Sequence, residues 1–180
     1  MIPFARDRLR NARPARQGPD VVEVGPQDLE RTVAMHLRCS ARTLWSRYHR
    51  AMGDPRSYLH TLLSRPGAVH LAVQQPAGDI VAVGHLMPDR GNAEAALLVE
   101  DAWQNSGLGS RLLRDLGHRA VGAGWKEVYG LVLPGDEKIP AILSHTSVPL
   151  HTLHEEGVTT VWAETGDIAA AEASTDAGAR

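Results

Sequence analysis

The sequence predicts one α+β domain, layered α/β/α, in which helices lie on both faces of a mixed, mostly antiparallel β-sheet. Three observations predict this fold: apolar residues recur with helical spacing before residue 65, short β-rich runs alternate with turn sequences from residue 69, and one strand–helix–strand unit begins at residue 93. A chain of 180 residues can build one complete core, and this length does not require a second domain. We expect the folded domain to span residues 20–166.

The two ends of the chain differ from this domain in composition. Residues 1–19 form a basic leader with five arginines, and residues 167–180 form a tail rich in alanine and small polar residues; we expect both to be disordered. The whole chain carries a net charge of only −2, so nucleic acid is not an expected partner. The leader has no apolar run long enough for a signal peptide or a membrane span, and no membrane partner is expected. Cys39, the only cysteine, excludes an intrachain disulfide and favours the reducing cytoplasm.

A short strand and three helices open the domain. The strand is predicted at 21–24. Of the helices that follow, the second has Ser40 as its N-cap and the third begins at residues 54–55 with an Asp-Pro pair. Each helix has an apolar face, which predicts a helical layer: Leu29, Val33 and Leu37 in the first, Leu44, Trp45 and Tyr48 in the second, and Tyr58, Leu59, Leu62 and Leu63 in the third.

Three further strands are predicted at 69–75, 80–87 and 93–100, separated by turn sequences at 76–79 and 88–92. Strands that follow one another through short turns pair antiparallel, which predicts a meander. An amphipathic helix at 107–123 leads to a strand at 127–133. Because a helix separates it from the strand at 93–100, these two strands should be parallel, with a right-handed connection.

The pattern weakens after residue 133. Pro134, Gly135 and Pro140 break any helix, which leaves about one turn at 141–144. The runs 150–154 and 158–164 then predict a terminal hairpin. Its free edge could pair with a second subunit, so a monomer and a homodimer both stay open.

The junction between strand 93–100 and helix 107–123 has the pattern Gln-x-x-Gly-x-Gly, formed by Gln104, Gly107 and Gly109. A glycine loop that opens onto a helix gathers free backbone N–H groups and predicts an anion site. No Lys-Ser or Lys-Thr follows the second glycine, as a nucleoside-triphosphate P-loop requires. The three-glycine dinucleotide pattern is also absent.

This motif, in its strand–loop–helix context, resembles the pyrophosphate-binding motif of the GNAT acyltransferase superfamily. The order of elements over residues 20–166 is also similar to the GNAT fold. The helices at 36–48 resemble the substrate-side helices of bacterial GNAT proteins related to protein-lysine acetyltransferases, which is a hint about the subfamily. The resemblance implies acetyl-CoA as cofactor, and a gap beside strand 93–100, opened at a bulge, that holds its pantetheine arm.

The resemblance also implies which residues bind coenzyme A. The loop and the first turn of its helix would hold the pyrophosphate through backbone N–H groups, and Leu98 and Val99 would offer backbone groups to the pantetheine arm and polarise the thioester carbonyl. Asp136 stands where relatives often have a cofactor-contacting asparagine. The implied cofactor residues are Leu97, Leu98, Val99, Gln104, Asn105, Ser106, Gly107, Leu108, Gly109, Ser110 and Asp136.

An amine must lose its proton to attack a thioester, because a free lysine has a pKa near ~10.4. Glu94 is the predicted catalytic base, since many GNAT members place a glutamate at this position of the strand. Glu100 and Asp101 compete for the role, but beside a pyrophosphate site their carboxylates are expected to face solvent. Many members also supply a tyrosine as general acid after the fifth strand; this chain has none between residues 134 and 154, and Ser144 or His145 could replace it.

Two functions follow from the resemblance. The first is an acetyl-CoA-dependent N-acetyltransferase that acts on a primary amine: a protein lysine, a protein N-terminus or a small amine. The second is a GNAT-like module that binds acyl-CoA for regulation. A metal site is not expected, because the spacing of His145, His151 and His154 fits no standard zinc pattern.

Overall fold

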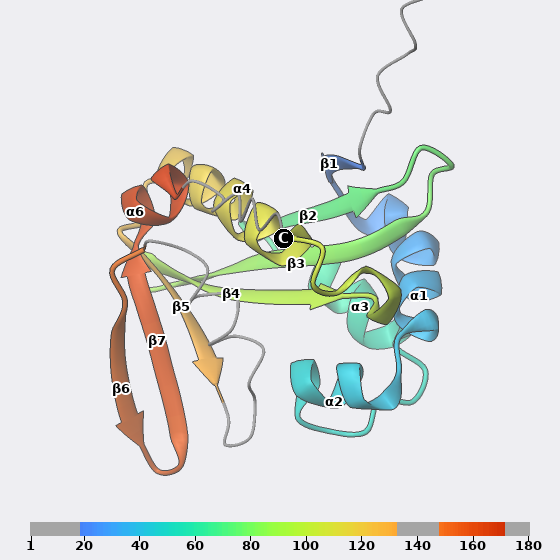
Figure 1. The fold of residues 1–180 in the computed structure, drawn as a ribbon, viewed down its shortest axis with the longest axis horizontal. Coiled ribbons are helices and arrows are strands. Elements are labelled where there is room, and N and C mark those ends of the chain that lie inside the picture. Colours follow the sequence, from blue (N-terminus) through green and yellow to red (C-terminus); the bar gives the residue numbers. More distant parts are fainter. Residues whose placement is uncertain (1–18, 133–147, 172–180) are drawn as a thin grey trace, which may run out of the picture.

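The computed structural model describes residues 19–132 and 148–171 and contains one seven-stranded sheet (Figure 1). The strands lie in the order β1-β2-β3-β4-β5-β7-β6. All neighbours pair antiparallel except β4 and β5, which are parallel. The mixed, mostly antiparallel sheet of the sequence prediction is therefore confirmed. The strands are β1 (Asp20–Glu23), β2 (Val69–Gln74), β3 (Ile80–Asp89), β4 (Asn92–Val99), β5 (Glu127–Val132), β6 (His151–Glu155) and β7 (Val158–Glu164).

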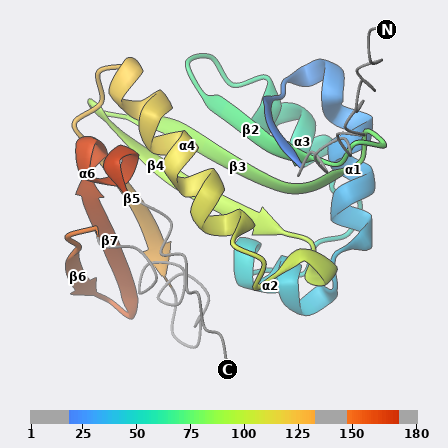
Figure 2. The same cartoon turned by 45° about the horizontal axis from the view of Figure 1, so that its top comes forward.

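Helices cover both faces of the sheet (Figure 2). The helices α1 (Leu29–Arg38), α2 (Ala41–Tyr48) and α3 (Arg56–Leu63) lie on one face, and α4 (Leu108–Gly122) and α6 (Thr165–Ala170) lie on the other. Two 3-10 turns precede α1 and α4: η1 (Pro26–Asp28) and η2 (Asp101–Trp103). Among the described residues, none of the helices is both long and apolar enough to cross a membrane.

The period-two alternation of the strands divides the core into two parts. On β4, Ala93 and Leu97 pack toward α4, whereas Leu98 packs toward Met35 of α1. Side chains at odd and even positions of a strand point to opposite faces, so Glu94 and Ala96 lie on the side of α1, α2 and α3. This alternation decides which residues of β4 face each helical layer.

The predicted apolar face of α1 is wrong at one position. Leu37 is 69% exposed, while Thr32, Met35 and His36 are fully buried. A four-residue spacing drifts around the helix, because four residues turn it by more than one revolution of 3.6 residues. The third residue of the series, Leu37, has therefore left the buried face. The predicted N-cap of α2 is confirmed, since the Ser40 side chain accepts a hydrogen bond from Thr43 N at 3.2 Å.

The domain continues past residue 166, where the sequence analysis placed its end. Helix α6 extends to Ala170, and Ile168 is buried with only 4% of its surface exposed. Gly117 of α4 permits this packing, because a Cβ there would lie 2.7 Å from Ile168 Cγ2 and 2.8 Å from Ala169 N. The single large apolar residue of this helix, Ile168, was too weak a signal to find it. The expected turn at 141–144 and most of the expected tail lie outside the described residues.

We predict that Gly117→Ala lowers the free energy of unfolding by about 1–3 kcal/mol, because the new methyl group would overlap Ile168 and the backbone of α6. The matched control is Gly122→Ala at the exposed end of the same helix, where a Cβ meets nothing within 4 Å. The control should be neutral or stabilise by up to about 1 kcal/mol. Urea denaturation followed by circular dichroism measures both, and equal effects would contradict the close contact.

Candidate functional site

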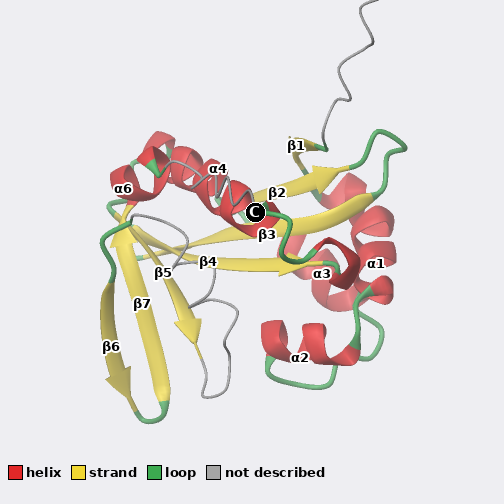
Figure 3. Cartoon of the chain, viewed as in Figure 1, coloured by secondary structure: helices red, strands yellow, loops and turns green. Residues whose placement is uncertain are grey.

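The parallel strands β4 and β5 touch only at their beginnings. Their pairing is limited to Ala93 with Val128 and Glu94 with Tyr129, and beyond these residues the strands point in diverging directions (Figure 3). The register between β3 and β4 is continuous from Asp89–Asn92 to Ala82–Val99. The divergence therefore arises without the bulge in β4 that the family resemblance implied.

Among the described residues, the edge of β4 beside this gap has no strand partner beyond Glu94, and of its backbone groups Val99 O accepts a hydrogen bond from the Gln104 side chain. Glu100 N donates to Val81 O at 3.0 Å, and the even-numbered residues of β4 continue this ladder toward β3. Because backbone groups alternate in direction along an antiparallel strand, Leu97 and Val99 direct theirs toward the gap. Leu98, which the sequence analysis also proposed for this role, directs its groups toward β3.

A pocket fills the gap on the α4 side of the sheet. Its lining is mostly apolar and comes from β4, α4, β5, β7 and α6, and it includes Ala95, Leu97, Gly130 and Trp162. At the narrow end β5 is still close to β4, since a Cβ on Gly130 would be in ordinary van der Waals contact with Ala95 O, at 3.7 Å. The pocket therefore begins where the parallel pairing ends.

The loop between η2 and α4 presents backbone donors. Gly107 has a φ of +79°, which favours glycine, and Asn105 also adopts a positive φ of +59°. The first helical hydrogen bond runs from Arg111 N to Gly107 O at 3.0 Å. In the described parts of the chain, the backbone N–H groups of residues 105–110 have no backbone acceptor. They form the concentrated set of donors at a helix N-terminus that the motif predicted.

Gln104 holds this loop in place. Its Nε2 donates to Val99 O at 3.0 Å and to Thr43 Oγ1 at 3.1 Å. The first bond fixes the end of β4, and the second ties the loop to α2. Its side chain therefore positions the backbone donors of the loop.

The two carboxylates beside the loop are hydrogen-bonded to the helical layer; Asp101 is exposed to solvent as expected, whereas Glu100 is partly buried. Asp101 accepts hydrogen bonds from Ser40 N at 2.8 Å, Ser40 Oγ at 2.7 Å and Thr43 Oγ1 at 2.8 Å. Glu100 Oε2 lies 3.0 Å from both Nε and NH2 of Arg38. Both acids thus connect the end of β4 to the helical layer of α1 and α2.

Partial desolvation raises the pKa of Asp101, but the hydrogen bonds donated by Ser40 and Thr43 outweigh it, and the net pKa is lowered. The carboxylate is therefore stabilised as an anion while it caps α2.

Glu94 lies at the narrow end of the gap, on the face of the sheet covered by α1, α2 and α3. Within the described residues its carboxylate has no hydrogen bond and no ion pair. Its parallel partner is Tyr129, whose hydroxyl donates to Asp89 Oδ2 at 3.0 Å. Burial, the hydrogen bond to Asp89 and the charge of Glu94 raise the pKa of Tyr129 to about 12.

Sequence reasoning missed Tyr129. Its position in a strand predicted to run parallel to β4 was the signal that could have placed it beside Glu94. The candidates Ser144, His145 and Asp136 lie outside the described residues. His151 stacks on Trp162, and His154 Nδ1 contacts Thr159 Oγ1 at 2.7 Å, so both rings have structural partners. Among the described residues, no three acidic, histidine or cysteine side chains are grouped as a metal would require.

The structure resembles solved acetyltransferases. The GNAT domain of PAT from S. lividans superposes with a TM-score of 0.71 at 23% identity, over 80% of this chain and 89% of that one. The chain has the GNAT fold. A ribosomal-protein-alanine N-acetyltransferase from Brucella melitensis has a TM-score of 0.60 at 15% identity, covering 81% of this chain and 98% of that chain. No protein-family model and no curated protein sequence matches the chain.

A third structure with the GNAT fold contains a ligand. It is a phosphinothricin acetyltransferase from Sinorhizobium meliloti in complex with AcCoA, with a TM-score of 0.59 at 11% identity, over 82% of this chain and 88% of that one. The GNAT fold thus accounts for the single parallel pair, β4 and β5, and for the helix layers on both sides of the sheet.

We predict that Asp101→Asn lowers the free energy of unfolding by about 1 kcal/mol at pH 7, because the amide is a weaker acceptor at the cap of α2. Folding lowers the pKa of Asp101, so its contribution is complete above the unfolded pKa and is lost as the pH falls through the folded pKa. The difference from the wild type should therefore shrink below about pH 4. Thermal unfolding at several pH values tests this. Glu155→Gln, on an exposed strand, is the control, and a pH-independent difference for Asp101→Asn would refute the charged cap.

Proposed function

We propose that this protein is an acetyl-CoA-dependent N-acetyltransferase that transfers an acetyl group to a primary amine. The observation that supports this most is the continuous path from the donor loop at 105–110, along the free edge of β4, to Glu94 at the narrow end of the gap. Solved proteins with this fold include acetyltransferases named for ribosomal-protein alanine and for spermidine, and one is bound to AcCoA.

The loop residues fit the pyrophosphate of coenzyme A. Gly107 has open space where a Cβ would stand, and its neighbours from Asn105 to Ser110 offer N–H groups at the positive end of α4. The nearby carboxylates of Glu100 and Asp101 are held by Arg38, Ser40 and Thr43. Their negative charge is therefore already engaged by protein donors.

The backbone groups of Leu97 and Val99 fit the pantetheine arm, which would lie along the free edge of β4. Bound acetyl-CoA supplies an activated acyl group as a thioester. A backbone N–H of this edge can donate to the thioester carbonyl oxygen, where negative charge develops during attack. The preference for Leu97 and Val99 over Leu98 follows from the direction of the β3–β4 ladder.

Glu94 is the proposed base. Its carboxylate, which has no partner among the described residues, can take a proton from the acceptor ammonium, directly or through water. The neutral amine then forms the C–N bond as the C–S bond breaks, and the proton that the new amide nitrogen loses is released to solvent. The sulfur leaves as a thiolate, which is a fair leaving group because a thiol pKa lies near ~8.5. Ser144 and His145 remain proposals for an acid that protonates it.

The same proposal includes the acceptor, which is a protein lysine, a protein N-terminus or a small amine. It also includes a cytoplasmic location and a monomeric or homodimeric state. The alternative function is a catalytically weak module that binds acyl-CoA for regulation, which the absence of a tyrosine between residues 134 and 154 favours. Both functions require the loop, and only the first requires Glu94.

Gly107→Glu should abolish acetyl-CoA binding, because the new side chain places bulk and negative charge in the donor loop. Wild-type protein should gain about 2.7 kcal/mol of stability at one hundred times the dissociation constant, measured by thermal shift. Gly157→Glu is the control for backbone strain: its φ of +80° matches the +79° of Gly107, and both have open space around them. Retained binding by Gly107→Glu would remove the loop from the cofactor site.

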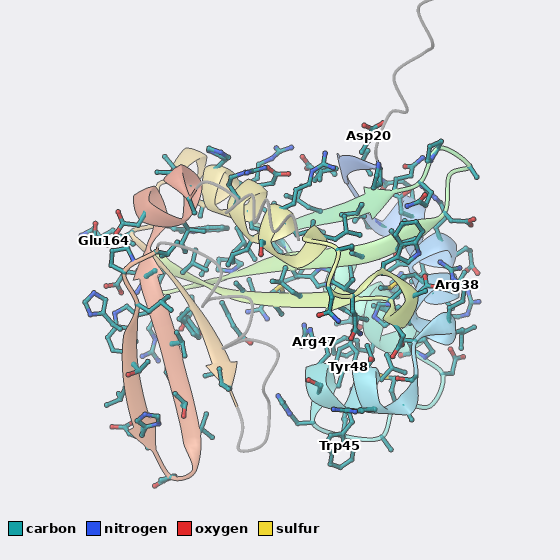
Figure 4. All side chains as sticks on the ribbon, in the orientation of Figure 1. Asp20, Arg38, Trp45, Arg47, Tyr48 and Glu164 are labelled. Atoms are coloured by element: carbon teal, nitrogen blue, oxygen red, sulfur yellow. The ribbon has the colours of Figure 1, made fainter. Side chains whose placement is uncertain are left out.

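Glu94→Gln should lower kcat at least tenfold while the thermal shift with acetyl-CoA stays near that of the wild type, because the amide cannot accept the proton. The control, Glu164→Gln, changes a glutamate at the end of β7, far from α2 (Figure 4). Turnover is followed by release of free thiol. Unchanged turnover in Glu94→Gln would assign the base to another group, and no turnover by wild type with any amine would favour the regulatory module.

A further inference from the structure

Arg47 is a charged residue for which the described residues provide no counter-charge. It makes no ion pair or hydrogen bond within them, and its Nε is buried without a hydrogen-bond partner. Other arginines on the same domain bind a carboxylate or a backbone carbonyl: Arg31, Arg38, Arg56, Arg111 and Arg119. Arg47 therefore differs from them in having an unused donor inside the protein.

The side chain of Arg47 lies on the side of α2 that faces the sheet. Figure 4 shows Arg47 and Tyr48 toward the sheet and Trp45 on the opposite side of the helix, where 57% of Trp45 is exposed. The guanidinium Cζ is 4.8 Å from the centroid of the Tyr48 ring. This stacking holds the charge in place and leaves its hydrogen-bond donors available.

The polar groups around Arg47 are neutral. The Tyr48 hydroxyl lies 2.6 Å from His36 Nε2, and His36 Nδ1 donates to Thr32 O at 2.8 Å, so in the neutral ring Nε2 accepts a hydrogen bond from the Tyr48 hydroxyl. Burial lowers the pKa of His36 to about 4, and burial with the Arg47 charge lowers the pKa of His85 well below its usual range. These groups therefore supply no anion to balance Arg47.

The position of Arg47 relates it to the proposed base. Helix α2, which carries Arg47, packs against β4, and His85 of β3 pairs with Ala96 of that strand. Ala96 and Glu94 are two residues apart and face the same side of the sheet, a separation of about 7 Å along a strand. Arg47 thus lies on the face of the sheet that α1, α2 and α3 cover, which is also the face of Glu94. We call this face the acceptor side; the pocket lies on the opposite face, beside α4.

A partly buried charge without a partner is unfavourable, and an anionic ligand would remove the cost. The planar guanidinium fork matches the two oxygens of a carboxylate. We propose that Arg47 binds a carboxylate of the acceptor, and that the acceptor is a small amino acid with its amine at Glu94. This deepens the proposed function and rests on it. A cationic polyamine would be repelled at this position.

The test compares amines that differ only in the carboxylate. The probes are glycine, β-alanine, 4-aminobutyrate and 5-aminovalerate, each paired with the alkylamine in which a methyl group replaces the carboxylate. The series also measures the distance between the base and Arg47. For the best-fitting chain length, wild-type kcat/KM should favour the amino acid by about 10- to 100-fold, as expected for a charge-assisted bidentate contact.

Arg47→Met should remove this preference, so that kcat/KM for the amino acid falls to the value for the paired alkylamine. Arg47→Lys, which keeps the charge and loses the fork, should retain part of the preference. The control Arg50→Met removes a neighbouring exposed arginine that lies 5.5 Å over Tyr58, and it should keep the full preference. The thermal shift with acetyl-CoA reports folding of each variant.

Calorimetric titration of the coenzyme A-saturated protein with the same pairs measures the contact without turnover. Selective binding of the amino acid, lost in Arg47→Met, would support Arg47 even if acetyl transfer were absent and the proposed function failed. Equal use of amino acid and alkylamine by wild type would overturn the inference, as would a preference that survives in Arg47→Met. A lysine-containing peptide preferred over every amino acid would assign the acceptor to proteins instead.

Discussion

The short parallel contact between β4 and β5 is the constraint on which the candidate site depends. Only Ala93 and Glu94 of β4 pair with β5, and beyond them Leu97 and Val99 direct their backbone groups toward the gap, where Val99 O already accepts from Gln104. Buried backbone donors and acceptors need partners, so such an edge in the middle of a sheet is suited to bind an extended ligand. The pocket, the direction of the Leu97 and Val99 backbone groups and the position of Glu94 all follow from this divergence.

The end of β4 is held by contacts that also fix the acceptor side. Gln104 links Val99 to Thr43, and Asp101 caps α2 through Ser40 and Thr43. One cluster therefore sets the position of the donor loop and of the helix that carries Arg47. The donor loop and helix α2 are therefore held together by one set of hydrogen bonds, in which Gln104 and Asp101 bond to Thr43.

Charge is distributed unevenly around this support. The acids next to the loop are paired with Arg38 or with hydroxyl groups, and the histidines under α1 and α2 are neutral because they are buried. Glu94 and Arg47 lie on the same face of the sheet, and within the described residues neither has an ion-pair partner, as is also the case for Arg50 and Arg65. An amine with a carboxylate carries the two charges that complement them.

The sequence by itself determined the seven strands, the helices from α1 to α4, the Ser40 cap and the donor loop at Gly107, because these depend on periodicity, turn residues and backbone geometry within a few positions. It also selected Glu94, through a resemblance to other proteins. The tertiary structure decided that α6 packs on α4, which acids are paired, where Leu97, Leu98 and Val99 direct their backbone groups, and that Tyr129 lies beside Glu94. Asp101 meets Thr43 across 58 positions and Tyr129 meets Asp89 across 40. Contacts of this range depend on the register of the sheet and on the packing of α2, which no local pattern encodes.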